Sequence, residues 1–260
     1  MKPFLIAAIA LYALSLITVL IHHASKSKPV GGASKWLLVA GLLVHTGGLL
    51  ERIWSTGHAP MASMYETLVF FSWTTVLVSV IVIFRYDERE TEIVTVPVSI
   101  LAILFALANE KPGGPLTLIL RTRWFETHVT ASFAAYALFT LAFSAAAIYL
   151  WKKWRRTEEE ELKKFQDIAS RSILWGFCFF SASMFAGAVW AYLAWGTYWL
   201  WEPKVIWSFI VWFFYAGAMH AWYVREWRGT GLAIATVLGF IVVLFTYLGV
   251  SLLMKSSHNF

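Results

Sequence analysis

The sequence has little charge for its length. Charged residues make up 14% of its 260 residues and hydrophobic residues 59%, whereas a soluble domain carries about 25% charged and 45–50% apolar residues. A water-soluble core of this size needs less apolar sequence, so part of the chain must face lipid. The scarcity of charge therefore excludes an ordinary soluble domain and predicts a membrane protein.

Cysteine is nearly absent as well. The single cysteine, Cys178, lies inside an apolar run, which excludes an intramolecular disulfide and any CxxC or CxxCH motif within this chain. The N-terminal run 4–22 lacks both a basic segment beyond Lys2 and a small-residue cleavage pattern. We therefore expect this run to be a first membrane helix and not a signal peptide.

Long apolar runs are what the sequence has in abundance. Eight of them approach or reach the roughly 20 residues that a helix needs to cross a bilayer. They cover residues 4–22, 35–54, 66–84, 92–108, 126–151, 173–193, 205–224 and 231–254. The fourth is the weakest, because it is short and carries Pro97. We predict an all-α, polytopic fold of about eight transmembrane helices, with residues 1–260 forming one integral-membrane domain.

The basic residues give this fold an orientation. The four loops on one side of the spans hold three, two, seven and two Lys or Arg residues, 14 of the 21 in the chain. Loops rich in Lys and Arg stay in the cytoplasm, so we expect both termini and the loop 194–204 to lie outside. The net charge of +6 then reflects topology, and it does not imply a nucleic-acid partner.

Tryptophan is concentrated around that outer loop. The cluster consists of Trp190, Trp195, Trp199, Trp201, Trp207 and Trp212. An aromatic belt is one explanation, since Trp is enriched at membrane interfaces. The segment WGTYWLWEPKVIW also contains Gly196 and Pro203 and joins two spans, so its rings would equally form an apolar slot for a planar ligand. Composition leaves both explanations open.

Two segments resemble a known family. The stretch GAVWAYLAWGTYWLWEPKVIWSF is similar to the tryptophan-rich WWD segment of membrane haem-handling proteins of cytochrome c biogenesis, which include the CcsA/ResC, CcmC and CcmF proteins. The stretch RIWSTGHAPMASMYETLVFFSW at 52–73 resembles the CcsA type in particular. Its matching residues are Gly57, His58, Pro60, Tyr65, Glu66 and Trp73. The resemblance extends from about residue 45 to the C-terminus.

The chain departs from the family pattern at two places. The usual Trp-Asp-Pro-Lys-Glu core reads Trp201, Glu202, Pro203, Lys204, Val205. Glu202 keeps the negative charge on a longer arm, whereas Val205 loses a carboxylate. The C-terminal His-Ser-Tyr reads His258, Asn259, Phe260. These departures affect contacts with the edge of the haem and leave His258 and His128 intact.

The resemblance implies haem b as cargo, held for thioether attachment to the CxxCH segment of apocytochrome c. It assigns His128 and His258 as axial ligands of an outer haem, and imidazole is a usual ligand of haem iron. His220 becomes a candidate ligand of haem inside the membrane, completed by a histidine of a partner subunit. The remaining haem-contacting residues are Trp190, Trp195, Trp199, Trp201, Glu202 and Trp207. No catalytic side chain is implied.

Each of these histidines also has an explanation without haem. An interfacial histidine such as His128 is more often a hydrogen-bonding or snorkelling group. His258 would by itself belong to a terminal tail, and His220 would form an interhelical hydrogen bond. For the slot, we expect the rings of the loop to face one outward cleft, with Glu202 and Lys204 at its rim.

Other polar residues are expected to serve the fold. His45 should make a hydrogen bond that helps two helices to pack, and His58 should shape the outer surface without binding iron. The acidic run 158–161 should belong to a solvated cytoplasmic helix with i,i+4 ion pairs.

The resemblance also implies partners and a compartment. It predicts a ResB/CcsB-like membrane protein and apocytochrome c as partners, and a bacterial inner membrane as the location. An alternative is a CcmC-like subunit that hands haem to a chaperone without catalysing its attachment. A haem-free membrane scaffold with an ordinary aromatic belt is a further alternative. A neighbouring ResB-like gene favours a role in attaching haem to apocytochrome c. The lack of a Soret band in the purified protein favours the haem-free scaffold.

Overall fold

The computed structural model describes residues 1–25, 28–224 and 227–254, which are mainly helical and contain no strand. Eight long helices follow one another along the chain. They are α1 (Lys2–Ser25), α2 (Lys28–Thr56), α3 (Met64–Tyr86), α4 (Glu92–Ala108), α5 (Arg123–Trp154), α6 (Glu159–Trp195), α7 (Pro203–Tyr223) and α8 (Thr230–Leu244). Each predicted apolar run falls on one of them, with the eighth continuing beyond α8. The predicted all-α fold of about eight helices is therefore confirmed.

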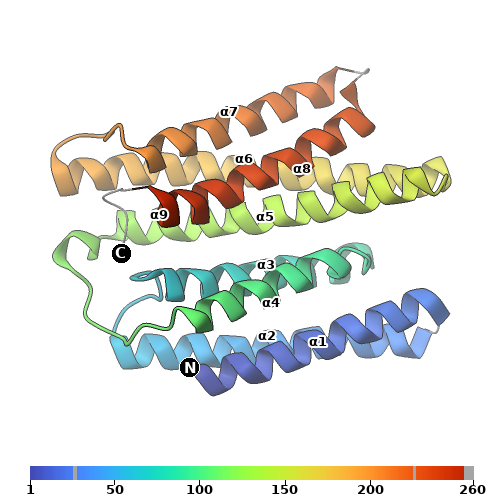
Figure 1. Ribbon diagram of the computed structural model, residues 1–260, viewed down its shortest axis with the longest axis horizontal. Helices are drawn as coiled ribbons and strands as arrows, with labels where there is room; N and C mark the ends of the chain where they lie inside the picture. The colour runs from blue at the N-terminus through green and yellow to red at the C-terminus, as the bar shows by residue number, and fades with distance from the viewer. Residues whose placement is uncertain (26–27, 225–226, 255–260) are drawn as a thin grey trace. The chain divides into compact units, whose positions relative to one another are not determined.

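The helices form two compact units (Figure 1). Unit 1 covers residues 1–118 and contains α1 to α4, and unit 2 covers residues 119–260 and contains α5 to α8. In unit 1, α1 contacts α2 and α4, and α3 contacts the same two helices. Unit 2 repeats this arrangement, because α5 and α7 each contact α6 and α8. Each unit is thus a four-helix bundle of up-and-down type. That residues 1–260 act as one domain stays a prediction.

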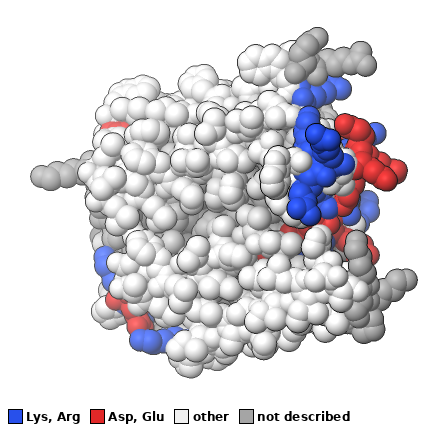
Figure 2. Space-filling view, turned by 45° about the vertical axis from the view of Figure 1, so that its right-hand side comes forward, with Lys and Arg blue, Asp and Glu red and all other residues white. Residues whose placement is uncertain are grey.

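The surfaces of these bundles suit lipid. Within the described part of the chain, seven helices are long and apolar enough to cross a membrane, and α4 is a shorter apolar helix. Large side chains such as Leu43, Phe185 and Phe213 are exposed on the spans. Most of the surface drawn in Figure 2 is formed by uncharged residues. Such a surface is costly in water, so the chain is an integral membrane protein.

The ends of the helices follow local capping chemistry. Ser63 and Thr122 have extended backbones and accept hydrogen bonds from the backbone N–H of Glu66 and Phe125, which begins α3 and α5. Gly196 ends α6 with a φ of 75°, a left-handed conformation that glycine adopts without a steric penalty. Pro203 then begins α7, where its missing N–H costs nothing. The outer loop is consequently short, covering residues 196–202.

Helix α6 is longer than the sequence suggested. The acidic run was expected to lie in a solvated helix, and it begins α6, which continues without a break from Glu159 to Trp195. Its polar first half is amphipathic, because Leu162 and Phe165 are buried. Glu161 forms an ion pair with Lys152 of α5. This extension therefore packs as the end of an α5–α6 hairpin.

His45 packs two helices of unit 1 together, as the sequence predicted. Its side chain is fully buried, and its Nδ1 lies 3.1 Å from the hydroxyl oxygen of Tyr12 on α1. Burying both groups without that bond would cost free energy on each side. Thr46, the next residue, accepts a hydrogen bond of 2.8 Å from Trp73 of α3.

Candidate functional site

The end of unit 2 that carries the tryptophan loop holds His128 in a defined orientation. His128 lies in the second turn of α5, and its half-buried ring faces α6. Its Nδ1 lies 2.9 Å from the backbone oxygen of Ser183. A carbonyl oxygen only accepts hydrogen bonds, so Nδ1 carries the proton in this contact. Nε2 is then the nitrogen that keeps its lone pair, which is the form of imidazole that ligates a metal.

Trp190 covers one side of His128. The two rings are nearly parallel, with centroids 6.1 Å apart and an interplanar angle of 18°. Trp190 is 1% exposed, and its indole N–H donates to the backbone oxygen of Ile119 at 2.9 Å. The ring of Trp195 meets that of Trp190 at 5.0 Å, edge to face. A histidine therefore packs beside two tryptophans at this end of the bundle.

The loop tryptophans divide into two groups. Trp195 lies with Trp190, whereas Trp199 and Trp201 pack on Phe209 of α7 at 5.0 and 5.8 Å. Trp201 is 72% exposed. The structure thus brings Trp190 and Trp195 to His128 and places the other two rings on the neighbouring helix. A single cleft shared by all of the loop rings stays a prediction.

The loop is tied to the end of the chain. Lys204, in the first turn of α7, donates to the hydroxyl oxygen of Ser251 at 3.1 Å, and Trp207 packs on Phe245 at 4.4 Å. Glu202 is the N-cap residue of α7. Ser251 belongs to the last helix, α9 (Val250–Leu253). The expected iron ligand His258 lies outside the described residues, and the chain reaches it from this anchored helix.

A π-helical turn precedes α9, and sequence periodicity gave no sign of it. This turn, η3 (Phe245–Gly249), joins α8 to α9, and such turns recur at functional sites. Tyr247 within it packs on Phe133 and Tyr136 at 5.3 and 5.9 Å. Both partners lie on α5, one and two turns after His128. The turn therefore aligns the end of the chain with the helix that carries His128.

His220 lies far from these residues along α7. It is seventeen residues after Pro203, the first residue of the helix, which corresponds to roughly 25 Å at 1.5 Å per residue. Its side chain is exposed, and its Nδ1 lies 2.8 Å from the oxygen of Ala216 in the same helix. The interhelical hydrogen bond considered for this residue is therefore replaced by a bond within α7.

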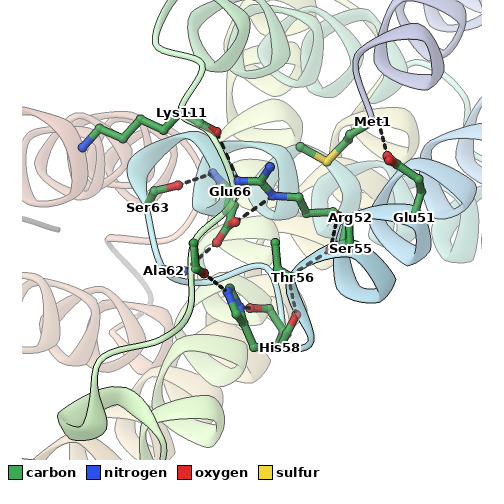
Figure 3. Close-up of polar contacts among 12 residues, drawn as sticks. Met1, Glu51, Arg52, Ser55, Thr56, His58, Ala62, Ser63, Glu66 and Lys111 are labelled. Atoms are coloured by element: carbon green, nitrogen blue, oxygen red, sulfur yellow. Dashed lines mark hydrogen bonds and ion pairs between the residues drawn. The ribbon is translucent and has the colours of Figure 1, made fainter.

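The second family-like segment, residues 52–73, forms a polar cluster in unit 1 (Figure 3). Arg52 of α2 donates through Nε to Glu66 of α3 at 2.8 Å. The other carboxylate oxygen of Glu66 accepts the backbone N–H of Ala62 at 2.8 Å. Arg52 also donates to the backbone oxygen of Lys111 at 3.2 Å. The buried carboxylate thus has charged and backbone donors, which clamp the α2–α3 connection to the segment after α4.

His58 belongs to the same clamp. Its Nδ1 and Nε2 lie 2.7 and 2.9 Å from the backbone oxygens of Ala59 and Gly114. Gly57, just before it, has a φ of 75°, which explains a glycine at this turn. Because both ring nitrogens face backbone oxygens, these contacts give His58 a structural role in this clamp.

Sequence reasoning missed two residues of α6 that touch His128. The Ser183 hydroxyl lies 3.1 Å from Nδ1 of His128 and donates to its backbone oxygen at 3.0 Å. A Cβ added to Gly187 would lie 2.6 Å from the same Nδ1. The small-residue stretch SASMFAGA was the available signal, since small residues let membrane helices approach closely.

Comparisons with known proteins point in one direction. Residues 61–258 match the model of the family described as cytochrome C assembly protein. The CcsA cytochrome c biogenesis protein of Prochlorococcus marinus strain NATL1A is 30% identical, over 87% of this chain and 84% of that protein. The CcsA protein of Synechococcus sp. strain CC9605 is 28% identical, over 91% of this chain and 89% of its own length.

A solved structure shares the fold. The cytochrome c haem lyase CcmF superposes with a TM-score of 0.74 and 17% identity, over 98% of this chain and 46% of that protein. The chain therefore spans about half the length of this structural neighbour. At this identity the likeness concerns the arrangement of the helices.

Proposed function

Because this chain belongs to the cytochrome c assembly protein family, we propose that it holds haem at the outer face of the membrane and presents it to apocytochrome c. A role in cytochrome c maturation and the handling of haem follow from the family. The proposal that His128 binds the haem iron rests on how its ring is held. Metal-ligating histidines usually donate their second ring N–H to a carbonyl or carboxylate, which fixes the ring and its tautomer. Nδ1 of His128 makes such a contact with the backbone oxygen of Ser183.

The aromatic residues around His128 suit a flat, apolar cargo. The indole rings of Trp190 and Trp195 lie beside the imidazole. In the segment that follows, Trp201 is exposed and Trp207 packs on Phe245. Haem b carries a large apolar face and two carboxylates, and Lys204 lies at the same end of unit 2. We assign the contacts with haem to these residues together with Trp199 and Glu202.

His258 is the proposed second axial ligand. Helix α9 ends at Leu253, five residues earlier, and five extended residues reach at most about 18 Å. The Lys204–Ser251 hydrogen bond holds α9 beside the start of α7. The tail therefore starts at the end of the bundle that carries the tryptophan loop, which supports its return to the iron.

His220 is the proposed ligand of a second, intramembrane haem site. An imidazole exposed on a membrane span is costly in hydrocarbon and is usually matched by a polar partner. The exposed residues Ile206, Ile210 and Phe213 continue its stripe along α7, which offers an apolar face to another helix. We propose that a ResB/CcsB-like partner covers this face and supplies the second imidazole.

Attachment of haem to the client requires the haem and the CxxCH segment to be positioned together, and it does not require a catalytic side chain. Each cysteine thiol of the CxxCH segment adds across one haem vinyl group, with its sulfur bonded to one vinyl carbon and a hydrogen to the other. The client's histidine replaces one of the two axial ligands. The chain contributes a fixed iron position and exclusion of water, because the reacting groups belong to the cargo and the client.

The test uses the full chain co-produced with its partner under haem-replete conditions. Haem per mole of protein is measured from the Soret band, and the yield of a client cytochrome c is measured by haem staining. His128→Gly should lose most of the outer haem and most of the cytochrome yield. His58→Gly, the matched change at another outer histidine, should keep its haem. Equal loading of the wild type and His128→Gly would refute the proposal.

A further inference from the structure

We propose that Gly187 and Ser183 of α6 are positioning residues that fix the ring of His128 and its tautomer for binding iron. The inference rests on the proposed function, since it concerns how one proposed iron ligand is held. Ser183 precedes the tryptophan-rich segment and Gly187 is its first residue, and neither is proposed to touch the iron. Both act through the imidazole of His128, which they contact from the neighbouring helix.

Gly187 leaves the space that the imidazole occupies. A Cβ at this position would lie 2.6, 2.9 and 3.3 Å from Nδ1, Cε1 and Cγ of His128. Three ring atoms at such distances mean that the ring lies against the backbone of α6. Gly187 sits in the middle of a regular helix, where glycine is unfavourable by about 1 kcal/mol relative to alanine. Close approach, and not backbone conformation, therefore explains the glycine.

Ser183 determines which ring nitrogen carries the proton. Its backbone oxygen lies 2.9 Å from Nδ1, and its hydroxyl donates to the backbone oxygen of His128 at 3.0 Å. With its proton used in that bond, the hydroxyl oxygen faces Nδ1 at 3.1 Å as a second acceptor. The hydroxyl oxygen of Ser132 lies 2.5 Å from that of Ser183, within hydrogen-bond distance. Two acceptors opposite Nδ1 hold the proton there, so Nε2 is the nitrogen presented to iron.

Trp190 completes the seat from the same helix face. Residues three apart on a helix are neighbours, and Trp190 follows Gly187 by three positions. Its indole stacks on the imidazole at 6.1 Å. The ring is thus confined by the glycine surface, the indole and the Ser183 oxygens. A ligand confined in this way loses little freedom when it binds, and its orientation depends on α6 as much as on α5.

Gly187→Ala is the decisive variant. The new methyl group should push the imidazole away and weaken binding of the outer haem by about 10–100-fold, the usual effect of disturbing a residue that orients a metal ligand. Added imidazole should restore the low-spin haem spectrum, as it should in His128→Gly. Ser183→Ala, which leaves the volume free, should weaken haem binding by about 10-fold. Gly231→Ala is the control, because a Cβ at Gly231 meets nothing within 4 Å.

The measurement is a haem titration of the complex with its partner, followed by the Soret band with and without imidazole. Size-exclusion chromatography verifies that each variant is folded. Wild-type haem affinity in a folded Gly187→Ala protein would overturn the inference, and so would a loss that imidazole does not restore. A His128→Gly variant that binds haem normally would instead overturn the proposed function itself.

Discussion

The imidazole of His128 and the indole of Trp190 lie nearly parallel, 6.1 Å apart between centroids and 18° apart in plane. The two residues come from α5 and α6, the two arms of one hairpin. Trp190 is itself fixed, because its N–H donates to the backbone oxygen of Ile119 just before α5. The pair therefore links the start of α5 to the end of α6 at the place where we assign the outer haem.

Trp190→Phe should weaken the outer site without unfolding the bundle. Phenylalanine keeps an aromatic face but lacks the N–H, so the hydrogen bond to the oxygen of Ile119 is lost, at a cost of about 0.5–1.5 kcal/mol, and the ring is held less firmly. We expect faster transfer of haem to apomyoglobin. Trp175→Phe, a change at a 60% exposed tryptophan of the same helix, is the control and should leave the rate unchanged. Equal rates in both variants would contradict the assignment.

Glu66→Ala should destabilise unit 1 strongly. It leaves the guanidinium of Arg52, whose side chain is 12% exposed, without its carboxylate, and removing one partner of a buried ion pair costs about 3–5 kcal/mol. Unfolding in mixed micelles measures the loss. Glu110→Ala breaks the exposed pair with Lys2 and should cost at most about 1 kcal/mol. Similar losses in the two variants would show that the Arg52–Glu66 clamp contributes little.

His220→Ala should lower haem loading at the outer site by interrupting supply. The residue is roughly 25 Å along α7 from its outer end, too far to touch a haem held by His128. Haem content and cytochrome c yield should both fall, and imidazole should restore them. Normal values for both would reduce His220 to a surface residue of α7 and remove the transmembrane route from the account.

The predicted orientation is open to a labelling test. In a Cys178→Ala background, Tyr198→Cys lies in the loop between α6 and α7, and Glu159→Cys lies at the other end of α6. A membrane-impermeant maleimide applied to intact cells should label the first variant and leave the second unlabelled until the cells are lysed. The reverse pattern would place both termini and the tryptophan loop in the cytoplasm.

The sequence predicted the helices well because each span must be apolar over about 20 residues, whatever its neighbours are. Caps such as Ser63 and Gly196 likewise depend on local chemistry. Pairings between helices were beyond reach, since lipid and protein interiors are equally apolar and the pattern does not say which face packs. The close approach of His128 to Gly187 is one such pairing. The π turn at Phe245–Gly249 was likewise not predictable from the apolar pattern.

The candidate site was predicted in part for the same reason. The resemblance to the family identified the tryptophans as candidates. Which of them pack on Trp190 and which on Phe209 depends on how α6 and α7 meet. His258, which lies outside the described residues, stays a prediction from resemblance. The structural role of His58 follows from contacts with residues 56 positions away, which no local pattern encodes.

The central claim is that one haem is held between His128 and His258 at the outer face. Electron paramagnetic resonance of the ferric complex, purified with its partner, tests it most directly. The account predicts that the outer haem contributes a low-spin signal of two axial imidazoles, beside that of the proposed His220 site. In His128→Gly and in His258→Gly the haem that remains at the outer site should give a high-spin signal, and its low-spin signal should return when imidazole is added. A low-spin signal that keeps its full intensity in both variants would contradict it.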